Sequence, residues 1–306
     1  MIRRLRISGL VLVALLVSML GTSAVHGQGG IAIRISPPNF ELEADPGQVV
    51  AQQIRVTNRG EAPIPITMEV AGFTPTGQEG QVALTEDEEV RGIVTWLTVS
   101  PRSFVLEPDQ EQQVTFVIEV PLDAEPGGHY ASILASVGAT TQAGAVAVGQ
   151  RVGSLVLLRV SGEVIEQARV TSFSVPGLSA KGPIPLDILV ENTGNVHVRP
   201  AGEIIVKGTF GGEVARIPVE QKAVLPGSPR TFSVTWDTGW KIGRYTAEYI
   251  GFYGSSNQQF VGTASFVIFP WPIALPILGV LALLAFGIVR GRQRLARAVR
   301  ILSGRE

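Results

Sequence analysis

The sequence contains no cysteine and only three histidines among its 306 residues. The lack of cysteine excludes disulfides, cysteine nucleophiles and thiolate metal sites. His129 and His197 are far apart in the chain, and His26 falls in an apolar N-terminal region. Because histidines do not cluster and acids do not pair in a recognisable motif, we expect no catalytic residue, no metal ligand and no cofactor, and therefore no enzyme.

Basic residues are scarce outside the two ends of the chain. Of the 25 lysines and arginines, three lie in the first six residues and six in the last 17, which leaves 16 between them. Acids number 25 in that central part, so its net charge is near −9. An acidic surface of this kind argues against a nucleic-acid partner and against binding an anionic leaflet.

Two apolar runs set the expected topology. The run 266–289 carries no charge and precedes six arginines (residues 290, 292, 294, 297, 300 and 305) with one acid, Glu306. Such a run is long enough for a helix to cross a bilayer of ~30 Å, and the arginines favour a cytoplasmic C-terminal side. We therefore predict a single-pass protein of the cell membrane with a span at 270–289, a basic cytoplasmic tail at 290–306, and all preceding residues outside the cytoplasm. Trp271 would lie at the outer interface.

The N-terminus has the layout of a secretory signal peptide. Three arginines precede the apolar stretch 10–20, and small residues follow it. We assign 1–27 to this signal, with an uncleaved first transmembrane helix as the alternative.

The central region has the patterning of β-sandwiches. Short runs of Val, Ile and Thr are separated by Pro-Gly and Asn-Arg-Gly turns. The stretch 113–120 alternates more cleanly than its neighbours, with apolar residues at all the even positions, as expected for a strand with one buried face. The stretch 93–99, which contains Trp96, also reads as an apolar strand, and no helical period of useful length precedes the anchor. The fold class is therefore all-β, with two tandem Ig-like sandwiches at 31–167 and 168–266 followed by one transmembrane helix.

An internal repeat supports two modules. Three cues occur twice in the same order: Val56–Gly60 and Val190–Gly194, 106–109 and 225–228, and 126–131 and 242–247. Asn-x-Gly supplies residues that tolerate positive φ in a tight turn, and Gly-x-Tyr resembles the tyrosine corner, in which the hydroxyl bonds to nearby backbone. The distance from Asn to Tyr is 72 residues in the first copy and 53 in the second, and most of the excess falls in 72–96.

The first module resembles the WxL-interacting protein family. The resemblance covers roughly residues 33–165 and rests on Ile35-Ser-Pro-Pro-Asn-Phe40, Asp45-Pro-Gly47, Leu106-Glu-Pro, and Pro126-Gly-Gly-His-Tyr130. It implies an Ig-like peptidoglycan-binding domain, a second Ig-like domain that binds a surface protein, a transmembrane helix and a basic tail. Other bacterial surface modules with Pro-Gly-x-Tyr strands share these cues.

Among individual residues, Trp240 is the candidate for an exposed binding contact, because it lies in a turn-like segment and loops carry recognition. Trp96 and Trp236 read as core residues, and the tyrosines at 245, 249 and 253 read as a buried stripe on one strand face. The acidic run 86–89 reads as a solvated turn rather than a calcium site. Residues 138–149, rich in Ala and Gly, read as a hairpin tip.

These observations predict a non-enzymatic adhesion or scaffold protein of the cell surface. On the family resemblance, it binds peptidoglycan through the first module and a surface protein through the second. The alternative is an extracytoplasmic chaperone or assembly factor with the same fold, in which a partner strand adds to an exposed sheet edge. An enzyme accessory and a transmembrane sensor are further alternatives, although a tail of 17 residues is too short for a folded signalling domain.

Overall fold

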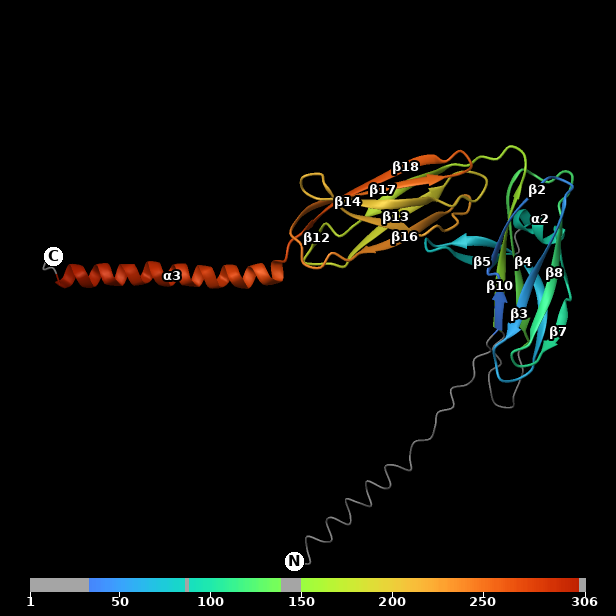
Figure 1. Cartoon of the computed structure of the whole chain (residues 1–306), viewed down its shortest axis with the longest axis horizontal. Coiled ribbons are helices and arrows are strands. Elements are labelled where there is room, and N and C mark those ends of the chain that lie inside the picture. Colours follow the sequence, from blue (N-terminus) through green and yellow to red (C-terminus); the bar gives the residue numbers. More distant parts are fainter. Residues whose placement is uncertain (1–32, 86–87, 139–149, 303–306) are drawn as a thin grey trace, which may run out of the picture.

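Two β-sandwiches and a C-terminal helix make up the computed structural model, which describes residues 33–85, 88–138 and 150–302 (Figure 1). The expected fold class is confirmed. The assigned signal peptide 1–27, most of the predicted hairpin tip 138–149, and the first two residues of the acidic run 86–89 lie outside the described residues.

The first module packs a four-stranded sheet against a six-stranded one. The smaller sheet has the order β1(Ile33–Ser36)–β3(Val49–Asn58)–β8(Glu111–Glu119)–β6(Leu97–Ser100). The larger has the order β2(Asn39–Ala44)–β10(Gln150–Val160)–β9(Gly127–Val137)–β4(Ile64–Thr76)–β5(Gln81–Thr85), with β7(Ser103–Leu106) also paired to β4. The predicted alternation in β8 is borne out, since Val114, Phe116 and Ile118 are fully buried between the sheets. Burial of these apolar faces supplies most of the stabilisation.

The second module repeats this plan with fewer strands. One sheet has the order β11(Ala168–Ser174)–β13(Ile184–Asn192)–β16(Pro229–Trp236). The other has the order β12(Leu178–Ser179)–β18(Gln258–Ile268)–β17(Gly243–Tyr253)–β14(Ala201–Lys207)–β15(Glu213–Val219). The predicted tyrosine stripe on β17 is confirmed, because Tyr245, Tyr249 and Tyr253 all lie in the core.

The two copies of Asn-x-Gly form the same buried turn. The Asn58 side chain is fully buried, donates to the carbonyls of Ala62 and Leu106, and accepts from the amide of Gly60. Asn192 makes the equivalent bonds to Val196, Val224 and Gly194.

This geometry corrects the reason that we gave for the motif. Neither the asparagines nor these glycines adopt positive φ. The side-chain amide instead closes the turn and ties it to a distant strand, as Asn does in Asx turns.

The predicted strand at 93–99 is wrong in its first half. Residues Glu88–Trp96 form the helix α2, and the strand β6 begins only at Leu97. Ile93 is buried and Trp96, three positions later, packs against the same core, which places both on one side of the helix. Packing of this turn on the sandwich therefore overrides the strand preference of the β-branched residues.

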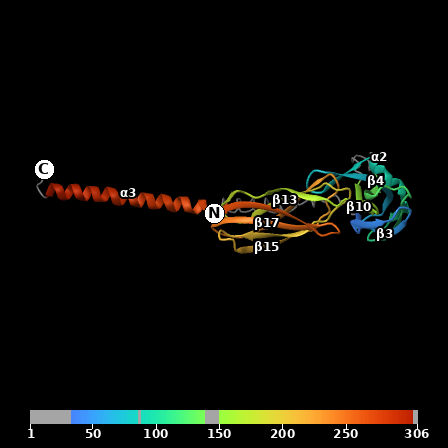
Figure 2. The ribbon, with the colours of Figure 1, turned by 90° about the horizontal axis from the view of Figure 1, so that it is seen from above.

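The C-terminal helix α3 runs from Trp271 to Leu302. Its segment Trp271–Arg292 has a mean hydropathy of 2.5, and no part of that segment is buried against the protein. At 1.5 Å per residue these 22 residues extend about 33 Å, which matches a bilayer core. Figures 1 and 2 show α3 and the second module following one line, with the first module at the end away from the helix.

Candidate binding cleft between the two modules

Several backbone contacts fix the junction between the modules. The amide of Gly128 donates to the carbonyl of Asn195 at 2.8 Å, and the Asn195 side chain accepts from the amide of Ile165 at 2.7 Å. The amide of His197 donates to the hydroxyl of Tyr130 at 2.8 Å. Each bond joins a segment of one module to the other module or to the connection between them. Together these bonds restrain the angle between the modules.

Tyr130 therefore does not form the tyrosine corner that its motif predicts. Its hydroxyl bonds to His197 of the second module instead of nearby backbone. Tyr245, the counterpart in the second copy, keeps the local arrangement, with its hydroxyl 3.4 Å from the carbonyl of Ile242. The same motif thus serves the junction in one module and a local turn in the other.

Burial shapes the electrostatics of this junction. It raises the pKa of Tyr130 well above its usual range, opposed by the hydrogen bond from the backbone of His197. It lowers the pKa of His197 to about 4, assisted by the positive charges of Arg199 and Arg159. The Nδ1 atom of this imidazole lies 3.4 Å from the Tyr130 hydroxyl.

A second contact comes from the turn that joins β4 to β5. It reaches β16 of the second module, where the amide of Thr231 donates to the carbonyl of Gln78 at 2.6 Å. Gly80 lies directly against the guanidinium of Arg230, and a Cβ there would come within 2.4 Å of that group. Gly80 has φ +80°, so glycine permits both the turn and the close approach. This hairpin belongs to the 72–96 excess, which therefore builds an interdomain contact.

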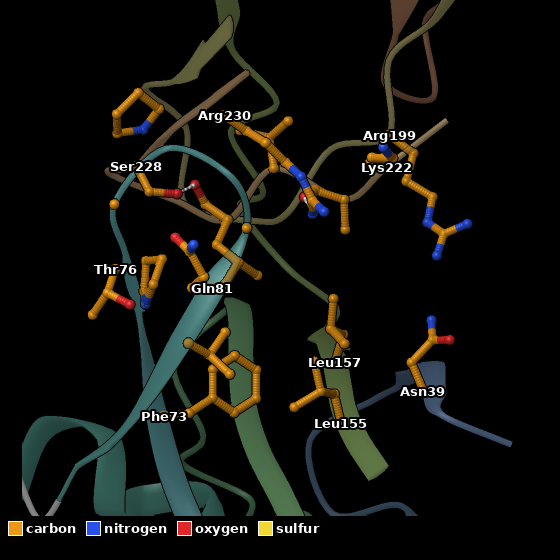
Figure 3. A pocket seen from close by; sticks show the side chains of 18 of the residues that line it. Asn39, Phe73, Thr76, Gln81, Leu155, Leu157, Arg199, Lys222, Ser228 and Arg230 are labelled. Carbon is orange, nitrogen blue, oxygen red and sulfur yellow. Dashed lines mark hydrogen bonds between the residues drawn. The ribbon is translucent and has the colours of Figure 1, made fainter. Parts of the chain in front are cut away.

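Between these two contacts lies a cavity with a volume of about 290 Å³ (Figure 3). One side is apolar, formed by Phe73 on β4, Leu155 and Leu157 on β10, and Leu225 from the second module. Three bases lie opposite, Arg199, Lys222 and Arg230, and no acid is among the described residues of the lining. We call this site the interdomain cleft.

The three bases differ in their partners. Arg199 forms an ion pair with Glu41 on β2, and Lys222 pairs with Glu220 at 3.1 Å. Arg230 donates from Nη1 to the carbonyl of Ala223 at 2.6 Å, but it has no carboxylate partner within the part of the chain that the structure describes.

The Arg230 guanidinium is also incompletely hydrogen bonded. Its Nε atom is buried and lacks a hydrogen-bond partner among the described residues. Burial, followed by repulsion from Arg199, lowers its pKa, whereas Glu220 opposes this shift. A guanidinium stays charged in proteins, so the cleft holds a partly desolvated positive charge with one unused hydrogen-bond donor.

The structure places the predicted contact residue elsewhere. Trp240 is 57% exposed, as expected for a turn residue, but its turn lies at the end of the second module from which α3 departs, because Gly243 is opposite Ile268. Trp96 packs its ring 4.7 Å from that of His129, and Trp236 is buried, so both are core or half-buried residues. No group of acids or histidines that could hold a metal occurs among the described residues.

Sequence reasoning missed the residues of the interdomain cleft. Phe73, Leu157, Leu225 and Arg230 come from four segments that no local pattern connects. The available signal was the extra length at 72–96, which marked an element present in one module and absent from the other.

Comparisons with known proteins give a likeness of fold. No family model matches the sequence, so the resemblance to the WxL-interacting family has no support from one, and no curated protein matches.

Solved structures do match the two-sandwich arrangement. The class 5 fimbriae chaperone CfaA is 12% identical, with 78% of this chain and all of that chain covered and a TM-score of 0.40. The E. coli chaperone DraB is 12% identical, with 78% and 97% covered and a TM-score of 0.36. The periplasmic chaperone SfaE is also 12% identical, with 78% and 100% covered and a TM-score of 0.35. At these identities the likeness concerns the fold alone.

Proposed function

We propose that this chain is a membrane-anchored, extracytoplasmic protein-binding module, which receives an extended acidic segment of a partner protein in the interdomain cleft. It acts by binding and carries out no reaction. The observation that carries the proposal is the half-buried guanidinium of Arg230, whose buried Nε has no hydrogen-bond partner and which lacks a carboxylate partner among the described residues.

The cleft is suited to a segment with both acidic and apolar side chains. A carboxylate from the partner would accept hydrogen bonds from Arg230 and offset its desolvation, and such charge-assisted bonds are among the strongest in proteins. Apolar side chains of the same segment would be buried against the partly exposed Leu155 and Val82, which pack on the buried Phe73. Glu41 and Glu220 already hold the other two bases, so Arg230 is the principal anchor.

The strand β10 offers a backbone partner for the same segment. Its residues Leu155–Val160 pair with β2, whereas no described strand pairs with Gln150–Ser154 on the side away from β9. Leu155, which lines the cleft, comes directly after this open stretch. A partner strand that adds here would end where β2 occupies the same edge at Leu155, which is also where the cleft begins. The main chain would then supply affinity, and the part of the segment that enters the cleft would supply selectivity.

The helix α3 supports the proposed location in the membrane. Its apolar segment has the length of a membrane span and is not covered by either module, and arginines follow it. The positive-inside rule then places both modules outside the cytoplasm.

Peptidoglycan binding by the first module, which the family resemblance implies, has less support from the residues. The exposed large apolar side chains described in that module are Val49, Leu84, Val105, Leu122 and Ile165, and none is aromatic. A sugar-binding face usually presents aromatic rings, whose apolar body and polar edge suit such ligands. Adhesion to the cell wall is therefore treated as the competing outcome of the test.

The test is a binding titration of the full chain in nanodiscs against fluorescent 12-residue peptides. The probes alternate Val with either Asp or Asn, so that they differ only in charge. We expect the Asp peptide to bind about tenfold or more tightly than the Asn peptide, since a charge-assisted hydrogen bond contributes about 1.5–3 kcal/mol. The Arg230→Gln variant should lose this preference, and Arg230→Lys should keep part of it.

The control variant is Arg55→Gln, which removes an exposed positive charge from β3 outside the cleft. It should bind as the unmodified chain does. Equal binding of both peptides, or an equal loss in Arg55→Gln and Arg230→Gln, would refute the cleft as the site. Retention on insoluble peptidoglycan that does not depend on Arg230 would favour the cell-wall function instead.

A further inference from the structure

Three loops of the second module gather where α3 begins. The strand β12 pairs with Val267 and Ile268, the last residues of β18, and Gly243 at the start of β17 is opposite Ile268. The amide of Gly182 donates to the carbonyl of Gly239 at 2.9 Å. These bonds hold the loops 178–182 and 237–242 beside the entry to the helix.

The hairpin between β14 and β15 joins them. Its Thr209 hydroxyl donates to the carbonyl of Arg244 at 3.1 Å, one residue beyond Gly243. Figure 1 shows this end of the module, with β12, directed toward α3. The three loops therefore face the same side as the helix.

The tips of these loops expose large apolar side chains. Phe210 at the tip of the β14–β15 hairpin is fully exposed, and Ile242 is 69% exposed. Similar side chains come from β12, from the 237–242 turn and from the residue that follows β18: Leu178, Trp240 and Phe269. We call these five residues the membrane-facing loop cluster. Exposed apolar groups gathered in this way mark a contact surface.

The charges around the cluster are mainly positive. Lys181 lies with Nζ 5.5 Å from the centre of the Trp240 ring, and Lys241 lies 5.9 Å from that of Trp236. Neither lysine has an ion-pair partner among the described residues, whereas Asp237 is the acid in the same turn. Aromatic rings next to lysines are the composition found where proteins meet lipid headgroups.

The connection to the helix fixes how far this surface can be from the bilayer. Only Phe269 and Pro270 separate Ile268, the end of β18, from Trp271, the start of α3. The three steps from Ile268 to Trp271 extend about 11 Å at most. If Trp271 lies at the outer interface, the loop cluster lies at the depth of the headgroups.

We propose that the membrane-facing loop cluster inserts Phe210, Trp240 and Ile242 into the outer leaflet, so that the second module rests on the lipid surface and stands in line with α3. This inference depends on the proposed anchoring by α3. Its occupant is lipid because the cluster continues the surface of the spanning helix and carries unpaired lysines, which suit phosphate groups. The cluster thereby fixes the orientation of the interdomain cleft relative to the membrane.

The absence of cysteine permits a direct test, because a single introduced cysteine can be labelled. The full chain carrying Phe210→Cys is labelled with an environment-sensitive dye and reconstituted into vesicles of phosphatidylcholine and phosphatidylglycerol. The matched control is Leu122→Cys, since Leu122 is also highly exposed and apolar but belongs to the first module. We expect emission at position 210 to shift to shorter wavelength and to lose intensity with spin-labelled lipids, and that at position 122 to do neither.

The outcomes separate this inference from the anchor. Vesicles that float with the protein while the dye at 210 reports water, as at 122, would refute the loop cluster and leave the anchor intact. Failure of the protein to float with vesicles would refute the anchor, and this inference with it. A spectral shift that follows protein concentration and resists spin-labelled lipids would indicate a second copy of the chain and would overturn the assignment to lipid.

Discussion

Lowering the pH from 7 to 4 should weaken the junction between the modules through His197. The folded protein holds this imidazole neutral, because burial and then the charges of Arg199 and Arg159 lower its pKa to about 4. The unfolded chain has the ordinary value of 6.5. Between these values the unfolded chain binds more protons, so the free energy of unfolding falls as the pH falls. The stabilisation is complete above pH 6.5 and is lost as the pH passes through about 4.

The size of the effect follows from the two pKa values. Each tenfold difference in proton affinity corresponds to 1.36 kcal/mol, so the predicted loss from His197 is about 1 kcal/mol at pH 6, about 2 kcal/mol at pH 5 and about 3 kcal/mol at pH 4. Such a loss is a large part of the stability of an ordinary domain. The other titrating groups add their own dependence, so a variant is needed to isolate this one.

The comparison uses urea unfolding of the full chain in detergent, followed by tryptophan fluorescence, at pH 7, 6 and 5. The matched variant is His197→Gln, which keeps a polar side chain but cannot titrate in this range. Between pH 7 and 5 the unmodified chain should lose about 2 kcal/mol more than the variant. Equal losses in the two proteins would refute the idea that His197 is held neutral by its surroundings.

Three further comparisons test the packing. Replacing Asn192 by Ala should lower the free energy of unfolding by about 2–4 kcal/mol, and Asn58→Ala by a similar amount, because each fully buried amide makes three hydrogen bonds. A urea titration in which either variant is as stable as the unmodified chain would contradict the role of these amides in closing the turn. Tyr130→Phe should destabilise the chain by about 1–3 kcal/mol, since the His197 amide loses its acceptor. Tyr245→Phe loses only a 3.4 Å contact and should cost less than about 1 kcal/mol. Thermal melts in which Tyr245→Phe lowers the Tm more than Tyr130→Phe would contradict the role of Tyr130 in joining the modules. Phe232→Ala should cost about 3–5 kcal/mol in denaturant unfolding, because its side chain lies in the core of the second module; a loss below about 1 kcal/mol would show that the core is not packed as described.

The strand pattern was predictable from the sequence because a strand buried on one face alternates apolar and polar residues. Val114, Phe116 and Ile118 show this directly. The duplication was visible for a related reason, since Asn58 and Asn192 perform the same bonding task in each copy. Local sequence patterns are enough for a prediction where the contacts of a side chain are set by its own strand or turn.

The helix α2 and the interdomain cleft were not predictable in this way. In α2 the residues around Ile93 favour a strand, and packing against the sandwich decides otherwise. In the cleft, Phe73 and Arg230 meet only because Gln78 and Tyr130 bond to the second module. Nothing in either segment indicates the other, so the site follows from the angle between modules.

The direct joining of β18 to α3 has a mechanical consequence. A partner that pulls on the first module while α3 stays in the membrane would load β18 along its own length. It pairs with β17 over the whole length from Gly243 to Tyr253, and the hydrogen bonds of this antiparallel pair run across that direction. Under such tension the bonds carry the force together in shear instead of opening one after another. The second module should therefore resist unfolding when it is pulled along this direction.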